Sequence, residues 1–252
     1  MERIEENQIK ISIVSVVYNA DEVFEKTILS VIGQTYSHIE YIVIDGESTD
    51  HTKDIIQKYR NYIDVLVMEK DQGIYDAMNK ALTLATGDFL IFMNAGDLLL
   101  SNDTIEWVVS YITKKDNVYY GDAIFVNDER KQMTLYAEEF TKFTICNKNL
   151  CHQTIFYPRI AYQTMRFDLR YSVMADYKYN ITLMKEYSFV HLPLIVCLYN
   201  TCEISSYKKD SFFSEKLFII FQQLGFLYGI FAICTMQFWE WKLFIKKLAR
   251  IQ

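Results

Sequence analysis

Proline and glycine are scarce in this sequence, with two prolines and eight glycines among 252 residues. Linkers between domains are commonly rich in these two residues. No such linker, internal repeat or low-complexity stretch precedes about residue 205. We therefore predict one folded domain over residues 1–206, followed by a separate tail over residues 207–252.

Cysteine is also sparse. The five cysteines form no C-x-x-C pair, which excludes a disulfide scaffold and argues against zinc ribbons and redox motifs. Free thiols are typical of a reducing compartment. The first ten residues are polar and charged, so we expect no signal peptide and a cytoplasmic location for the domain.

Charge is distributed unevenly along the chain. Residues 207–252 carry seven Lys/Arg and three Asp/Glu, a net charge of +4 within a chain of net charge −6, so the first 206 residues carry −10. An acidic body argues against nucleic acid as a partner. A basic, apolar tail instead favours contact with the anionic inner face of the plasma membrane, so we expect peripheral association with that surface.

Short apolar runs alternate with amphipathic stretches in the first hundred residues. We expect strands over residues 11–17, 41–44, 63–68 and 88–93, and helices over residues 21–34, 50–59 and 74–85. This alternation predicts an α/β fold with a mainly parallel central sheet flanked by helices. Later segments predict a mixed second half, with strands over residues 118–120, 123–126 and 131–136 and a helix over residues 176–186.

The tail contains a long uncharged run, residues 217–239, which is long enough to span a bilayer. Basic residues flank it on both sides, contrary to the positive-inside tendency. A helix or helical hairpin lying in the cytoplasmic leaflet, with Phe238, Trp239 and Trp241 among the headgroups, is the favoured interpretation. A spanning helix, a helix packed on the body and a homodimer contact remain open.

Glycine-rich phosphate loops are missing, because neither G-x-G-x-x-G nor G-x-x-x-x-G-K-[ST] occurs. This disfavours dinucleotide binding, P-loop hydrolysis and nucleotidyl transfer. Polar residues nevertheless follow the predicted strands and should converge at one sheet edge. They are Tyr18, Asn19, Asp45, Asn94 and Asp97. A nucleoside diphosphate at that edge needs a divalent cation, and Mn²⁺ or Mg²⁺ bound through Asp97 is the candidate.

Several segments, taken in order, resemble the family 2 glycosyltransferases of the GT-A fold. The segments are ISIVSVVYN (residues 11–19), SVIGQTY (30–36), YIVIDGESTD (41–50), DQGIYDAMNK (71–80) and ATGDFLIFMNAGD (85–97), with weaker similarity at 151–153, 175–177 and 199–206. The resemblance is strongest to bacterial enzymes that build capsule, exopolysaccharide or lipopolysaccharide repeat units on a membrane lipid carrier.

The resemblance implies a role for each matching residue on the donor side. Asp45 would face the nucleotide base, and Gly46 stands where the family often has a second acidic residue. Asp97 would be the metal ligand, with Asn94 and Gly96 at the earlier acidic positions of that motif. The remaining donor contacts implied are Tyr18, Asn19, Asp71, Asn79, Lys80 and Asn94. Lys80 is equally well interpreted as a solvated helix residue.

On the acceptor side, Asp176 matches the family's general base. From the residues alone, a helix N-cap is the favoured interpretation of Asp176, and the resemblance reverses that preference. His152, Gln153 and Tyr177 are predicted to contact the acceptor or the diphosphate. A hydrogen-bonded histidine near the core is an equal alternative for His152, and Tyr75 and Tyr177 are placed where a sugar could stack.

The expected function is inverting, metal-dependent transfer of a hexosyl-type sugar. The donor would be a nucleotide-sugar and the acceptor a hydroxyl of a lipid-linked saccharide, in bacterial surface polysaccharide synthesis. The alternative is a non-catalytic module of the same fold that binds a nucleotide-sugar without turnover. The thinned acidic positions Gly46, Asn94 and Gly96 motivate this alternative.

Overall fold

One sheet runs through the described part of the chain, which comprises residues 9–126, 131–134, 140–200 and 209–235 of a computed structural model. Its strands are β1 (Ile11–Val17), β2 (Ile39–Asp45), β3 (Val65–Met68), β4 (Phe89–Phe92), β5 (Leu98–Leu99), β6 (Val118–Val126), β7 (Lys131–Thr134), β8 (Ile155–Pro158) and β9 (Phe189–Asn200). Their order across the sheet is β3-β2-β1-β4-β8-β6-β9-β5, and β7 pairs with β6.

The first half of the sheet is parallel, as predicted. Strand β1 pairs in parallel with β2 and with β4, and β2 pairs in parallel with β3. Every residue of β1 and β4 is buried, which explains why these strands are mostly apolar and do not alternate between apolar and charged residues. The predicted α/β architecture with a mainly parallel central sheet is confirmed.

The second half is mixed, also as predicted, but one strand prediction is wrong. Residues 118–120 and 123–126 belong to the single strand β6, not to two strands separated by a turn. The pairing of β6 with β9 shifts register next to Gly121. A Cβ atom at Gly121 would lie 2.7 Å from the carbonyl oxygen of Leu194, so glycine lets β9 approach where the sequence suggests a break.

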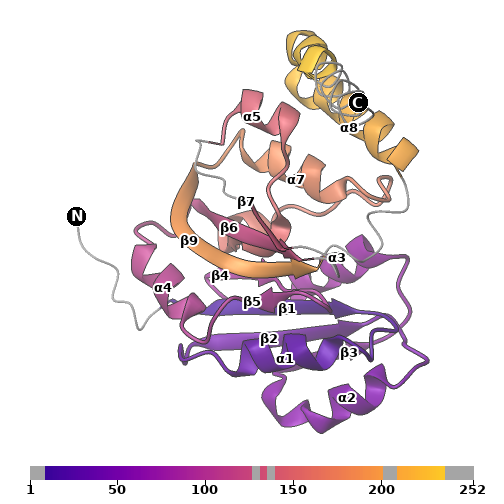
Figure 1. Cartoon of the computed structure of the whole chain (residues 1–252), viewed down its shortest axis with the longest axis vertical. Coiled ribbons are helices and arrows are strands. Elements are labelled where there is room, and N and C mark those ends of the chain that lie inside the picture. Colours follow the sequence, from indigo (N-terminus) through magenta and orange to yellow (C-terminus); the bar gives the residue numbers. More distant parts are fainter. Residues whose placement is uncertain (1–8, 127–130, 135–139, 201–208, 236–252) are drawn as a thin grey trace, which may run out of the picture.

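Helices cover both faces of the sheet (Figure 1). On one face, α1 (Phe24–Ile32), α2 (Thr52–Lys58) and α4 (Thr104–Tyr111) bury apolar residues against the outward row of β1 that includes Ile11 and Ile13. On the other face, α3 (Ile74–Leu84), α5 (Lys142–Asn147), α6 (Arg159–Tyr162) and α7 (Ala175–Leu183) contribute buried residues to the core that includes Val14 and Val16. Successive side chains of β1 therefore point to opposite faces of the sheet and belong to two separate hydrophobic cores.

The predicted helical tail begins with α8 (Lys209–Leu224), and residues 226–235 are also helical. Gly225 joins the two helical segments with a φ of 94°, a left-handed conformation that favours glycine. Ile219, Ile220 and Ala232 are fully buried in the same core as α7, so this part of the tail packs on the body. The boundary at residue 206 and the residues Phe238, Trp239 and Trp241 lie outside the described residues.

The described helices include none that combines the length and the apolar character needed to cross a bilayer. Several large apolar side chains of the tail nevertheless face solvent. They are Phe218, Phe226, Leu227 and Ile230, with Leu227 82% exposed. Figure 1 shows α8 at the opposite end of the molecule from α2. The tail thus has one buried face and one exposed apolar face.

A buried carboxylate, Glu40, links several segments near the amino ends of the parallel strands. It accepts hydrogen bonds from the side chains of Lys10 (2.8 Å) and Ser12 (2.6 Å) and from the backbone N–H of Thr86 (2.8 Å). Burial alone would raise the pKa of Glu40, but these donors outweigh it and lower the pKa from 4.5 to about 2. The folded state therefore favours the ionised carboxylate.

We expect Glu40→Gln to destabilise the protein at pH 7 by about 2–3 kcal/mol. Because folding lowers the pKa of Glu40, its contribution is complete above pH 4.5 and disappears as the pH falls towards 2. Urea unfolding at pH 7 and pH 3 measures the effect, and the variant should lose this part of the pH dependence. Glu25→Gln, which removes a solvent-exposed partner of Lys58, is the control and should change little. Equal stability of Glu40→Gln and the parent at pH 7 would contradict the assignment.

Candidate active site

Polar residues gather at the carboxyl edge of the parallel strands. The backbone N–H of Gly46 donates to Val17 (2.9 Å), and that of Ala95 donates to Val16 (3.3 Å), so the loops after β2 and β4 lie on either side of the end of β1. This is the edge at which ligands bind in open parallel sheets. The predicted convergence of strand ends is therefore present in the structure.

Asp176, in the first turn of α7, is held by side chains from distant segments. Its Oδ1 accepts from the Tyr75 hydroxyl at 3.1 Å, and its Oδ2 accepts from the Asn149 amide at 3.0 Å. The residue is 9% exposed. Met174 occupies the N-cap position, and no side chain caps the helix. The N-cap interpretation of Asp176 is thus wrong, because its carboxylate is held by Tyr75 and Asn149 and not by the helix backbone.

Tyr75 fixes the orientation of that carboxylate. Burial, with the negative charges of Asp176 and Glu215, raises the pKa of Tyr75 well above its ordinary value, so its hydroxyl stays protonated. The hydroxyl also lies 2.6 Å from the carbonyl oxygen of Val173. The ring packs on Phe167, with centroids 5.6 Å apart. Tyr75 therefore orients the Asp176 carboxylate. Its ring packs on Phe167, so these contacts do not support the predicted stacking of Tyr75 on a sugar.

His152 links the base candidate to the end of β4. Its Nε2 lies 3.1 Å from the Asn94 side-chain amide nitrogen, and its Nδ1 lies 3.6 Å from Oδ2 of Asp176. The Asn94 amide nitrogen can only donate, so Nε2 is the acceptor in this orientation of the amide. His152 is therefore hydrogen-bonded in the wall of the site, in agreement with one of the two interpretations of the sequence.

Asp97 is buried and oriented by the protein. Its Oδ2 accepts from the side-chain amide of Gln153 at 2.7 Å, and its Oδ1 accepts from the backbone N–H of Asn200 at 3.0 Å. Gln153 is 2% exposed. This burial corrects the predicted contact of Gln153 with the acceptor or diphosphate, because its amide faces Asp97 instead.

The donor set at the end of β4 fits a hard divalent cation only with help from the substrate. Within the described residues, no three His, Cys, Asp or Glu side chains form a metal cluster. The side-chain oxygen of Asn94 is buried and has no hydrogen-bond partner among the described groups. That oxygen and the Asp97 carboxylate suit Mg²⁺ or Mn²⁺, which need one or two protein ligands when phosphates supply the rest.

A second carboxylate, Asp71, takes the space where the family often has an acidic side chain. A Cβ atom built on Gly46 would lie 2.4 Å from Oδ2 of Asp71 and 3.4 Å from the ring of Tyr18. Oδ1 of Asp71 accepts from the backbone N–H of Gly73 at 2.9 Å. Tyr18 is 61% exposed. Asp71 therefore presents one oxygen beside an exposed aromatic ring, in front of a position without a side chain.

Two predicted donor contacts are used to build the loops of this edge. Asp45 is fully buried, and both of its oxygens accept from the backbone N–H of Ser48. This corrects the prediction for Asp45, because its carboxylate has no surface open to a base. Asn19 joins the loops after β1 and β2: its side-chain oxygen accepts from the backbone N–H of Thr49 at 2.8 Å. Contact of Asn19 with a donor stays a prediction.

Three further predicted residues are occupied elsewhere. The Asn79 amide exchanges two hydrogen bonds with the backbone of Phe167, at 2.9 and 2.8 Å, and its contact with a sugar donor stays a prediction. Lys80 forms an ion pair with Glu69 at 2.9 Å, and its donor-side role stays a prediction. Tyr177 is fully buried and donates to the carbonyl oxygen of Ile145, so the predicted sugar or acceptor contact of Tyr177 is wrong.

No sequence motif marks Asn149, although its side chain contacts the base candidate directly. It belongs to a segment without a motif, and its partner is 27 positions away. Only the fold brings the two side chains together. A buried amide that donates to a carboxylate, as Asn149 does, is recognised from its contacts and not from its residue type.

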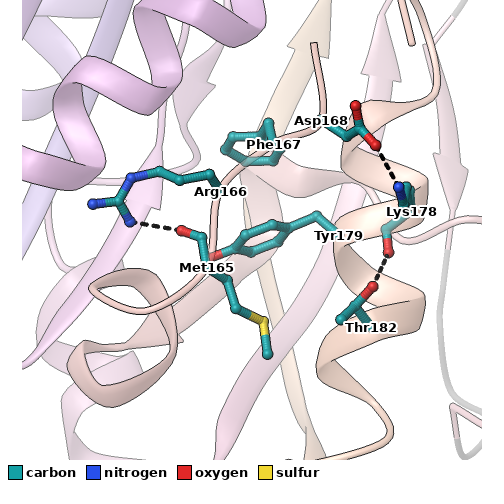
Figure 2. Close-up of a pocket in the computed structure, with 7 residues that line it drawn as sticks. All are labelled: Met165, Arg166, Phe167, Asp168, Lys178, Tyr179 and Thr182. Atoms are coloured by element: carbon teal, nitrogen blue, oxygen red, sulfur yellow. Dashed lines mark hydrogen bonds and ion pairs between the residues drawn. The ribbon is translucent and has the colours of Figure 1, made fainter. Parts of the chain in front are cut away.

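A pocket of about 400 Å³ lies along the other side of α7 (Figure 2). It is lined by Met165, Arg166, Phe167, Asp168, Lys178, Tyr179 and Thr182. The Tyr179 ring reaches across it towards Met165, and its buried hydroxyl has no partner among the described residues. Lys178 and Asp168 form an ion pair at its edge. Phe167 lines this pocket and also packs on Tyr75, the residue that donates to Asp176.

Comparison with known proteins shows which family the chain is similar to. A family model described as glycosyl transferase family 2 matches residues 12–181. A PGL/p-HBAD biosynthesis glycosyltransferase of Mycobacterium bovis is 33% identical over 197 residues, which cover 75% of this chain and 76% of that protein. The putative teichuronic acid biosynthesis glycosyltransferase TuaG of Bacillus subtilis is 38% identical over 90 residues, 34% of this chain and 36% of that protein.

Solved structures share the fold at low sequence identity. TarS 1–349 of S. aureus, in complex with UDP, superposes with a TM-score of 0.71 and 20% identity over 85% of this chain. The chain spans 65% of the length of that TarS chain. The mannosyltransferase PcManGT of Pyrobaculum calidifontis, in complex with GDP-Man and Mn²⁺, superposes with a TM-score of 0.58 and 17% identity, over 88% of this chain and 64% of that one.

Proposed function

Since the chain belongs to glycosyl transferase family 2, we propose that it is an inverting enzyme of bacterial surface polysaccharide synthesis. It transfers a hexosyl-type sugar from a nucleotide-sugar to a hydroxyl of a lipid-linked saccharide. The names of the mycobacterial and Bacillus relatives, which concern PGL/p-HBAD and teichuronic acid biosynthesis, support a cell-surface product. The observation that carries the proposal is the buried Asp176 carboxylate, oriented by Tyr75 and Asn149.

Asp176 acts as the general base. A sugar hydroxyl is a weak nucleophile and gains reactivity as it loses its proton. The hydroxyl oxygen bonds to the anomeric carbon, its proton passes to the Asp176 carboxylate, and the bond from that carbon to the diphosphate oxygen breaks. One displacement of this kind inverts the anomeric configuration. The donors Tyr75 and Asn149 keep the carboxylate in place without taking the proton themselves.

The leaving group departs on the side of Asn94 and Asp97. Their oxygens would hold Mg²⁺ or Mn²⁺ together with the diphosphate, and such a cation neutralises charge on a departing phosphate. Gln153 keeps Asp97 oriented by its hydrogen bond. His152 separates this side from the base, since its two ring nitrogens face Asn94 and Asp176.

Asp71 and Tyr18 form the place for the nucleotide base. Oδ2 of Asp71 lies in front of Gly46, beside the exposed ring of Tyr18. A carboxylate accepts from the ring N–H groups of uracil, thymine or guanine, and an aromatic ring stacks on any base. The pair supports recognition of a base that carries such an N–H group, and it replaces the role predicted for Asp45.

A donor panel tests the proposal. The full chain is incubated with UDP-, GDP- and dTDP-sugars and Mn²⁺ or Mg²⁺, with and without an extract of lipid-linked saccharides, and nucleoside diphosphate release is recorded. We expect release from one donor, faster with the extract and lost in chelator. Calorimetric binding of a nucleoside diphosphate without release from any donor would favour the non-catalytic module instead.

We also propose that the enzyme works in the cytoplasm, bound peripherally to the inner face of the plasma membrane. The exposed apolar side chains of the tail support this location, together with the net charge of +4 over residues 207–252. Apolar side chains enter the interface while basic residues attract anionic lipid. A lipid-linked acceptor would meet the enzyme on that surface.

The double variant Phe226→Ser, Leu227→Ser is expected to bind membranes about tenfold more weakly, since both side chains lose apolar contact area. Cosedimentation with phosphatidylglycerol vesicles measures the loss. The control is Trp107→Ser, which removes a 46% exposed ring from α4, on the other face of the sheet. Unchanged vesicle binding by the double variant would contradict membrane docking.

A further inference from the structure

Helix α8 contacts both segments that flank Asp176. Glu215 accepts a hydrogen bond from the backbone N–H of Met174 at 3.2 Å and another from the Ser172 hydroxyl at 3.4 Å. Met174 is the residue immediately before α7. Glu215 thus holds the chain two residues before the base.

The neighbouring residue, Lys216, reaches the other side of the base. Its ammonium group donates to the carbonyl oxygen of Asn147 at 3.1 Å, at the end of α5. Two residues later, the Asn149 amide donates to Oδ2 of Asp176. Lys216 therefore holds the short segment from which this donor extends.

Stability alone gives no reason for a lysine at this position. Lys216 is 7% exposed, and burial lowers the pKa of its amine. Within the described part of the chain, its ammonium group contacts the carbonyl oxygen of Asn147 and the face of Tyr177, 5.7 Å from the ring centroid. An apolar side chain of similar length would avoid the cost of burying a charge. The contact with Asn147 is the feature that requires an ammonium group.

We propose that Glu215 and Lys216 are positioning residues for Asp176. Together they form a clamp from α8, one arm on residues 172–174 and the other on Asn147, and the clamp fixes the relative placement of Asp176 and Asn149. This inference rests on the proposed function, in which Asp176 is the base. It makes the tail part of the catalytic machinery as well as a candidate membrane contact.

The test uses Lys216→Met, which keeps the length of the side chain and removes the amine, and Glu215→Gln, which removes one acceptor oxygen. The matched control is Gln223→Ala on the same helix, because Gln223 contacts Lys185, beyond the far end of α7. Each is measured with the donor that turns over in the panel, with the lipid extract as acceptor. We expect kcat to fall about tenfold in both clamp variants, with donor affinity within twofold of the parent, since a small displacement of a catalytic group is costly.

A second arm separates positioning from a general structural effect. Each clamp variant is combined with Asp176→Asn, and the clamp substitution should then cause no further loss of the residual rate. The same fold loss in both backgrounds, or a kcat within twofold of the parent, would overturn the clamp while leaving the proposed function intact. Normal turnover by Asp176→Asn alone would instead overturn the proposed base. If Lys216→Met unfolds by circular dichroism, the partly exposed Glu215→Gln decides.

Discussion

Asp176→Asn is expected to transfer sugar about a thousandfold more slowly than the parent, with donor binding and folding retained. Asparagine keeps the size of the side chain, and its oxygen can accept from Asn149 while its amide donates to the Tyr75 hydroxyl oxygen, but it cannot take a proton from the acceptor hydroxyl. The loss therefore falls on kcat and not on donor affinity. Nucleoside diphosphate release gives the rate, and calorimetry with the nucleoside diphosphate gives the affinity.

Glu186→Gln is the control for this experiment, because Glu186 is an exposed carboxylate just beyond the end of α7. It should leave both quantities unchanged. The base assignment would be wrong if Asp176→Asn, shown to be folded by its thermal transition, turned over the donor at the parental rate. A parallel loss of donor affinity would point to a role in binding.

Asp97→Asn is expected to reduce transfer by about a hundredfold or more, and a chelator should reduce the parent enzyme to a similar level. The substitution removes the negative charge and places an amide against Gln153 or Asn200, both of which donate to Asp97 in the parent. Loss of a hydrogen-bonded buried group costs stability as well, about 1–3 kcal/mol. Transfer is therefore assayed well below the thermal transition of the variant.

The effect of Mn²⁺ on nucleoside diphosphate binding tests whether Asp97 holds the cation. In the parent, Mn²⁺ should tighten nucleoside diphosphate binding, and in Asp97→Asn it should not. Asp103→Asn is the control, since Asp103 lies at the start of α4 and its side chain caps nothing. Full turnover of the parent in chelator would remove the cation from the proposed function, whatever the behaviour of Asp97→Asn.

The sequence was sufficient to predict the parallel half of the fold because its strands are buried on both faces. Short, mostly apolar runs such as β1 and β4 are typical of interior strands of such a sheet. The sequence is less informative for β6, because a glycine at position 121 suggests a turn. The structure shows instead that β9 approaches the backbone closely at Gly121. Local pattern predicts a strand, whereas close approach of another strand depends on the tertiary structure.

The candidate site divides in the same way. Residue types at strand ends pointed to Asp97 and, through the family resemblance, to Asp176. The sequence does not reveal which polar side chains are buried, so it predicts ligand contacts for Asp45 and Tyr177 that their burial does not allow. Asn149, Glu215 and Lys216 carried no signal, because their contacts with the base region join segments far apart in the chain.

The Asp71 carboxylate in front of Gly46 has a consequence for the evolutionary history of this protein. A side chain gained at position 46 would meet Oδ2 of Asp71, so the Asp71 side chain would have to turn away from its present place beside Tyr18. An acid at either position can therefore supply the negative charge at this place. Among related sequences, we expect the acid at position 71 to accompany glycine at position 46.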